Sequence, residues 1–353
     1  ILFFDVYWFY RSFSLVITAY LGSKKIKEAE AKNWLELIAK LPDFEKVNHI
    51  IIIPNYKETP EKLRRIVGTI AAQTFPLKQT YVVLAMEKRE ESAPEKAEAI
   101  LKDFNDTFGG IYVTFHPDIP GEVKGKSSNE SYAAKEINKI LIDSARLDIN
   151  FATVTTADAD SMFDRQYFSY LGYDFLKEPK RYNRFWQSAN VDHNNFWSVP
   201  AATRIFSFFS SLYRTGLLVQ GDRLIATSTY SLSFLLLKRI GYWDTDVIPE
   251  DYRVFFKVFF MMKGDISANP IFLKTSMDSP LSSTYISSLR NKYSQIRRWS
   301  YGVSDDPLFI RWWLTIPGVP FVRKTKILFH VLLDHFLWPA NWFILTIATS
   351  VIT

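Results

Sequence analysis

Cysteine is absent from the 353-residue sequence, and only five histidines are present. A chain without cysteine has no disulfide framework, no thiolate zinc site and no thiol nucleophile. The histidines are scattered and no HExxH segment occurs, so the sequence does not predict a zinc hydrolase of that type. The chemistry of this chain therefore depends on other side chains.

Several common nucleotide and hydrolase motifs are missing as well. There is no GxGxxG segment to support a nicotinamide or flavin dinucleotide, and no GxSxG turn of a serine hydrolase. The segment GEVKGKSS at 121–128 is similar to a P-loop, but three residues separate its glycines where the P-loop has four. A nucleoside triphosphatase is therefore not expected.

The sequence also lacks a segment in which charges of one sign are concentrated. The chain has 43 Lys and Arg against 37 Asp and Glu, and the basic residues are spread among the acids without a basic stripe. A nucleic-acid-binding protein is therefore not expected, because such proteins concentrate positive charge on one surface. Aromatic residues are abundant, at 16% of the chain. They suit an aromatic-lined site, a membrane interface, or both.

Both ends of the chain are apolar. Residues 1–20 are interrupted by Asp5 and Arg11, so we expect a membrane-associated or interfacial helix within 1–30, the end of a span. Residues 336–353 contain no charge and predict the start of a transmembrane helix, with a buried core helix as the alternative.

The basic residues beside the apolar ends predict the side of the membrane on which the intervening domain lies. Basic residues at 24–25 and at 323–326 lie on the inner side of the two apolar segments, which places the intervening domain in the cytosol. Residues 303–335 are interpreted as interfacial helices. We expect a piece of a multi-pass protein of the cell membrane.

The middle of the chain alternates between strand and helix patterns. Four apolar runs rich in β-branched residues predict buried strands, and helical patterns lie between them. The predicted strands are 49–54, 80–86, 111–115 and 151–155, and the predicted helices are 60–73, 94–107 and 128–144. This order predicts a Rossmann-like α/β fold, a mostly parallel sheet with helices on both faces. Ligands of such sheets bind beyond the carboxyl ends of the strands.

Two carboxylates follow the fourth predicted strand. Asp158 and Asp160 are two residues apart in the segment ADADS. Paired carboxylates can hold Mg²⁺ or Mn²⁺ together with a diphosphate, and the metal then neutralises a leaving nucleoside diphosphate. A solvated turn is the alternative interpretation.

Two further motifs follow downstream. Glu250 and Asp251 precede a helical pattern, where a carboxylate can be a helix cap or a general base. Gln295, Arg298 and Trp299 have the spacing of one helix face. The indole offers a stacking surface for a sugar, and the other two offer hydrogen-bond donors. The alternative is a surface helix with one buried tryptophan.

The order of these motifs resembles the membrane-bound family 2 glycosyltransferases, which include cellulose, chitin and hyaluronan synthases and have a GT-A fold. PNYKE after the first strand, a GK loop, DxD, ED and QxxRW follow one another. The resemblance spans about residues 49–302, and we assign the GT-A domain to 45–302. It implies inverting sugar transfer from a nucleotide sugar, with a UDP-sugar expected, to a glycan or lipid-linked acceptor at the cytosolic membrane face.

The resemblance also implies roles for individual residues. Asp158 and Asp160 would bind the metal, Asp251 would be the catalytic base with Glu250 beside it, and Asp158 would also face the ribose. The implied nucleotide pocket consists of Pro54, Tyr56, Glu58, Glu87 and Lys126. Gln295, Arg298 and Trp299 would hold the acceptor near the donor diphosphate.

One position departs from the family pattern. Where the family usually carries an acidic pair after the second strand, this chain has LAMEKRE, and Glu87 is the only acid in the expected place. A carboxylate there can still accept a hydrogen bond from uracil or guanine, so the base stays open. The alternative function is a catalytically inactive membrane module of this fold that binds a nucleotide sugar or glycan.

Overall fold

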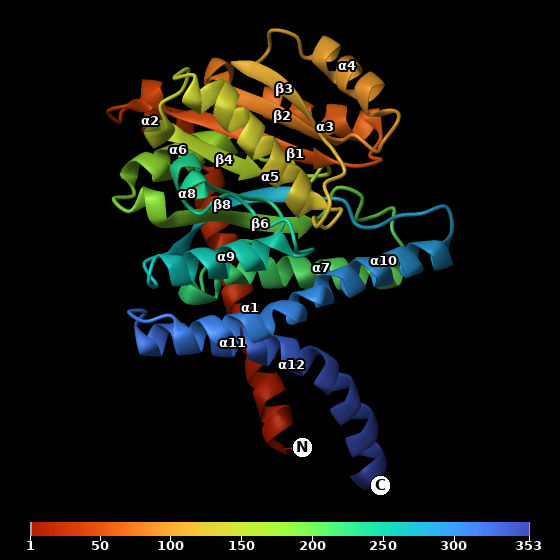
Figure 1. Ribbon diagram of the computed structural model, residues 1–353. Coiled ribbons are helices and arrows are strands. Elements are labelled where there is room, and N and C mark those ends of the chain that lie inside the picture. Colours follow the sequence, from red (N-terminus) through yellow and green to blue (C-terminus); the bar gives the residue numbers. More distant parts are fainter. Residues whose placement is uncertain (1, 353) are drawn as a thin grey trace.

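The computed structural model describes the backbone of residues 2–352 and the side chains of residues 4–337 and 340. Its centre is an eight-stranded sheet with the order β3-β2-β1-β4-β7-β6-β8-β5 (Figure 1). The strands are β1 (Asn48–Asn55), β2 (Thr80–Glu87), β3 (Gly110–His116), β4 (Ala152–Thr156), β5 (Met162–Phe163), β6 (Arg184–Asp192), β7 (Tyr230–Ser233) and β8 (Ser267–Met277).

Helices cover this sheet and extend from it (Figure 1). They are α1 (Leu2–Glu30), α2 (Trp34–Ala39), α3 (Pro60–Ala71), α4 (Ala93–Asp103), α5 (Lys126–Ile137), α6 (Tyr167–Lys177), α7 (Ala201–Leu217), α8 (Phe234–Arg239), α9 (Glu250–Met261), α10 (Tyr285–Ser300), α11 (Asp306–Thr315) and α12 (Phe321–Ile352). Short 3₁₀ segments connect several of them.

Strands β1 to β4 form the parallel half of the sheet, with β1 between β2 and β4. The side chains of β1 alternate between two cores. Ile50 and Ile52 pack in the core that includes α5, whereas Ile51 and Ile53 pack in the core that includes α3. All four are fully buried. The four predicted strands and the two helical layers are therefore confirmed.

The other half of the sheet is mixed. β7 runs antiparallel to both β4 and β6, β6 is parallel to β8, and β5 is antiparallel to β8. Four of the seven strand pairings are therefore parallel, as the expected mostly parallel sheet requires, and the unbroken parallel arrangement is the β1–β4 half. The reversal at β7 places the segment before it next to the carboxyl end of β4, where the DxD residues lie.

α1 and α12 extend from the domain on the same side (Figure 1). α1 packs closely along α7, where a Cβ atom added to Gly22 would clash with the Thr215 carbonyl and one added to Gly216 would lie 2.7 Å from Thr18 Oγ1. An Arg11–Asp334 ion pair of 3.2 Å connects α1 to α12.

The length and apolar character of the helices bear on the predicted membrane segments. Within the described part of the chain, no helix has both the length and the apolar character needed to cross a membrane. The transmembrane start predicted at 336–353 lies mostly among residues whose side chains are outside the described set. α11 and the first half of α12 occupy the segment 303–335, predicted to be interfacial.

Candidate active site

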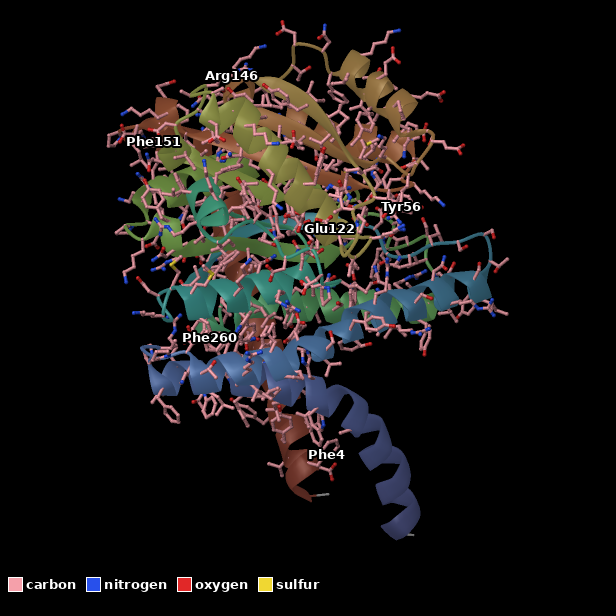
Figure 2. All side chains as sticks on the ribbon, in the orientation of Figure 1. Phe4, Tyr56, Glu122, Arg146, Phe151 and Phe260 are labelled. Carbon is pink, nitrogen blue, oxygen red and sulfur yellow. The ribbon has the colours of Figure 1, made fainter. Side chains whose placement is uncertain are left out.

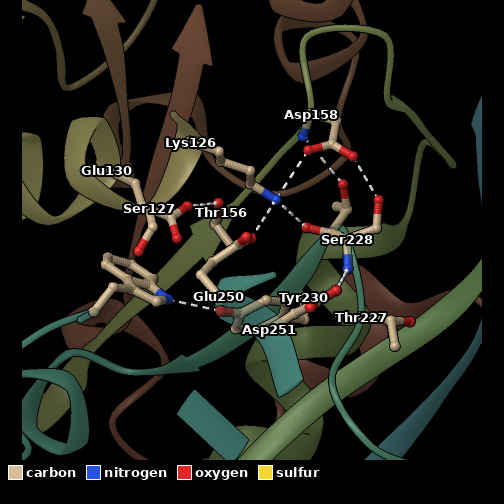
Figure 3. Close-up of polar contacts among 12 residues, drawn as sticks. Lys126, Ser127, Glu130, Thr156, Asp158, Thr227, Ser228, Tyr230, Glu250 and Asp251 are labelled. Atoms are coloured by element: carbon tan, nitrogen blue, oxygen red, sulfur yellow. Dashed lines mark hydrogen bonds and ion pairs between the residues drawn. The ribbon is translucent and has the colours of Figure 1, made fainter. Parts of the chain in front are cut away.

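The carboxylates of the two acidic motifs meet around one lysine (Figure 3). Lys126, the first residue of α5, places its Nζ atom 2.9 Å from Asp158 Oδ1 and 2.9 Å from Glu250 Oε1. Burial alone would lower the pKa of Lys126, but the charges of Asp158 and Glu250 raise it well above its usual value. Lys126 therefore stays a cation and holds the DxD and ED motifs together.

Ser228, just before β7, contacts the same three elements. Its backbone N–H donates to Asp251 Oδ2 at 2.8 Å, its hydroxyl donates to Asp158 Oδ2 at 2.5 Å, and its carbonyl accepts from Lys126 Nζ at 2.6 Å. Ser228 has a left-handed backbone with φ of 60°. Such conformations in residues other than glycine are costly and concentrate at functional sites. The sequence interpretation did not find this residue.

The ED motif forms the first turn of α9, and its two carboxylates have different surroundings. Glu250 is buried, which raises its pKa to about 7, against the opposing effect of Lys126. Burial also raises the pKa of Asp251, although the Ser228 N–H bond opposes this. Asp251 is therefore a stronger base than an exposed aspartate, as a general base requires.

Asp160, like Asp251, forms no ion pair with a described side chain. Burial raises its pKa to about 7, and the neighbouring Asp158 charge adds to the shift. Its Oδ2 atom accepts a 3.3 Å bond from the Asp278 N–H, and no ion pair to it forms among the described residues. A desolvated carboxylate beside a second one favours a bound cation.

These residues fit a divalent metal only in part. Among the described side chains, no three His, Asp or Glu residues are grouped so that they could hold a metal alone. Asp158 and Asp160 supply two oxygen-bearing groups, which suits Mg²⁺ or Mn²⁺ when substrate phosphate oxygens provide further ligands. The arrangement fits a metal that binds with a diphosphate.

The predicted nucleotide residues lie at the ends of β1 and β2. Glu87 is 3% exposed and lies 3.3 Å from Arg89 Nε, and the Arg89 guanidinium lies 4.1 Å from the centre of the Tyr56 ring. Glu58 pairs with Lys62 on α3 at 2.7 Å. Tyr56 and Glu87 are thus brought together through Arg89, which the sequence interpretation missed. Pro54 lies in β1 itself, and Lys126 lies in the carboxylate cluster.

The predicted acceptor residues lie on α10. Trp299 is 42% exposed, so the alternative of a buried tryptophan is wrong. Gln295 accepts a 2.9 Å bond from Lys292, while Arg298 is exposed and forms no hydrogen bond or ion pair with the described residues. Among the described residues, no hydrogen bond or ion pair joins these three to the carboxylates of the DxD and ED motifs.

Arg214 on α7 connects the two regions. Its guanidinium lies 5.7 Å from the centre of the Trp299 ring and pairs with Asp192 at 2.9 Å. Burial raises the pKa of Asp158, but the charge of Lys126 outweighs burial and lowers it. The charge of Arg214 adds a smaller lowering effect. A lone arginine in an aromatic helix gave no signal in the sequence.

Comparison with solved structures identifies the class of fold. Mannosyltransferase PcManGT from Pyrobaculum calidifontis, in complex with GDP-mannose and Mn²⁺, has a TM-score of 0.51 and 17% identity, over 94% of this chain and 89% of its own. S. aureus TarS has a TM-score of 0.51 and 14% identity, over 82% and 44%. Its 1–349 form with UDP-GlcNAc has 0.50 and 14%, over 82% and 73%.

These likenesses show that the chain shares the mixed α/β fold of these GT-A-type glycosyltransferases, which confirms the GT-A part of the predicted fold. No family model and no curated protein sequence matches the chain.

Proposed function

We propose that the protein is an inverting glycosyltransferase of the family 2 type. It transfers a sugar from a nucleotide sugar, with a UDP-sugar expected, to a glycan or lipid-linked acceptor. The observation that carries the proposal is the junction of the DxD and ED motifs around Lys126 at the end of β4. Support comes from the shared fold, since the PcManGT structure contains GDP-mannose and Mn²⁺ and a TarS structure contains UDP-GlcNAc.

In the proposed reaction, each side chain of the site has one role. Asp251 removes the proton of the acceptor hydroxyl while the hydroxyl oxygen attacks the anomeric carbon of the donor sugar. The bond from that carbon to the diphosphate oxygen breaks, and the configuration inverts in one displacement. Ser228 orients the Asp251 carboxylate through its N–H. Mg²⁺ or Mn²⁺ held by Asp158 and Asp160 would supply charge that neutralises the leaving diphosphate.

We also propose that the protein acts at the cytosolic face of a cell membrane. Large apolar side chains on α1 are exposed, among them Phe9 at 75% and Tyr20 at 70%. Figure 2 shows Phe4 on the part of α1 that extends away from the sheet. α7 adds exposed Ile205 and Phe209. Exposed apolar surface of this extent is typical of a membrane or protein contact.

The test is release of nucleoside diphosphate from a panel of nucleotide sugars by the detergent-solubilised protein, with and without Mn²⁺. Metal-dependent release from one donor, abolished in Asp160→Ala, is the expected result. Asp106→Ala is the matched control, because it removes an exposed carboxylate paired only with Lys78. Donor binding without release or transfer would favour the inactive binding module, and no binding of any donor would contradict both functions.

A further inference from the structure

A histidine connects two carboxylates at the ends of β2 and β3. His116, the last residue of β3, is in register with Glu87, the last residue of β2. Its Nδ1 atom lies 3.4 Å from Glu87 Oε2, and its Nε2 atom lies 2.9 Å from Glu122 Oε2. His116 and Glu87 are only 4% and 3% exposed. Polar groups buried to this extent need defined partners.

The backbone fixes this arrangement further. The Lys88 N–H donates to the His116 carbonyl at 2.9 Å, which continues the β2–β3 contact past the last paired residues. On its other side Glu87 lies beside Arg89, whose guanidinium covers the Tyr56 ring. The Glu87 carboxylate therefore lies between one imidazole and one guanidinium.

Glu122 belongs to a different segment, the loop 117–125 that leads to Lys126. The Val123 N–H in this loop donates to the Thr245 carbonyl at 2.7 Å, five residues before Glu250. His116 thus joins the predicted base pocket to the loop that positions the Lys126 cation. No other described side chain bridges Glu87 to this loop by a hydrogen bond or ion pair.

We propose that His116, held by Glu122, is a positioning residue that orients the Glu87 carboxylate toward an N–H group of the nucleotide base. This inference rests on the proposed function. Each ring nitrogen of His116 faces one carboxylate oxygen, so the two contacts fix the plane of the ring and, with it, the position of Glu87. This positioning also explains how Glu87 alone can recognise the nucleotide base where an acidic pair was expected.

The experiment measures affinity for UDP, GDP and pyrophosphate in Mn²⁺ by titration calorimetry. Pyrophosphate lacks a base, so it reports on the metal and diphosphate contacts alone. His116→Asn and Glu122→Gln should each weaken binding of the preferred nucleoside diphosphate by about tenfold and leave pyrophosphate affinity unchanged. Glu122 is partly exposed, so its variant tests the proposal even if His116→Asn folds poorly.

Asp118→Asn is the matched control, because it breaks an exposed 2.5 Å ion pair with Lys124 in the same loop. It should bind all three probes as the unmodified protein does. Unchanged nucleotide affinity in both variants would overturn the inference, and so would an equal loss of nucleotide and pyrophosphate affinity. An unmodified protein that binds pyrophosphate but neither nucleotide would instead contradict the proposed function.

Discussion

His49 in β1 should make the stability of the fold depend on pH. Its side chain is fully buried, its Nδ1 atom lies 2.6 Å from Thr153 Oγ1, and its Nε2 atom has no hydrogen-bond partner among the described residues. Burial lowers the pKa of His49 from 6.5 to about 3. Between these values this position carries one proton more in the unfolded chain than in the folded protein, so the contribution of His49 to the free energy of unfolding falls as pH falls.

The slope is about 1.4 kcal/mol per pH unit, and the whole shift corresponds to about 5 kcal/mol at pH 3. In urea unfolding from pH 7.5 to 4, this loss should be read as the difference between the unmodified protein and His49→Asn, because Asp160 and Glu250, with pKa values raised to about 7, stabilise the folded protein as pH falls over the same range. His49→Asn does not titrate, so the difference between its free energy of unfolding and that of the unmodified protein should grow in favour of the variant by about this slope as pH falls. His193→Asn, at an exposed position, should follow the unmodified protein. Parallel curves for His49→Asn and the unmodified protein would refute the reasoning.

Three other changes test the site and its support. Asp251→Asn should lower kcat by roughly 10²- to 10⁴-fold in a transfer assay while nucleotide affinity, measured by calorimetry, stays unchanged. Equal activity would remove Asp251 as the base. Trp299→Ala should raise the KM for acceptor more than it slows donor hydrolysis, and an equal fall in both would indicate a folding role. Gly22→Ala should lower the melting temperature, because its Cβ would clash with the Thr215 carbonyl of α7. Its control, Gly68→Ala in α3, meets no atom within 4 Å and should stabilise the protein by about 1 kcal/mol. A melting temperature unchanged by Gly22→Ala would mean that α1 does not depend on close contact with α7.

The parallel half of the fold was predictable because its signal is local. β1 and β2 are runs of apolar residues that are buried on both faces, so composition alone identifies them. β6 gives no such signal, since it buries Gln187, Ser188 and Asn190. Their partners are the carbonyls of Thr229 and Thr227 and the Thr275 hydroxyl. Because these partners lie far away in the sequence, no local pattern marks β6 as a buried strand.

The same distinction applies to the site. Asp158, Asp160 and Asp251 were predictable as candidates because acids after a strand or before a helix have a recognisable position. Ser228 could not be found, because its role depends on a left-handed backbone and on contacts with residues 70 and 102 positions away. Arg214 also acts through residues on other elements. The DxD and ED motifs therefore predict a candidate site whose hydrogen-bond geometry only the fold reveals.

The charge balance of the cluster gives these motifs their physical meaning. Lys126 compensates Asp158 and Glu250, and Ser228 compensates Asp251 in part through its N–H. Asp160 forms no ion pair among the described residues; one long bond from the Asp278 N–H and the charge of Lys62, which lowers its pKa against the larger effect of burial, are its support. Leaving a desolvated carboxylate beside a second one costs free energy, and proteins keep such groups mainly where they act on a ligand. The two Asp residues differ in this respect: Asp158 pairs with Lys126, whereas Asp160 pairs with no described cation and is the carboxylate to which the proposed function assigns the metal.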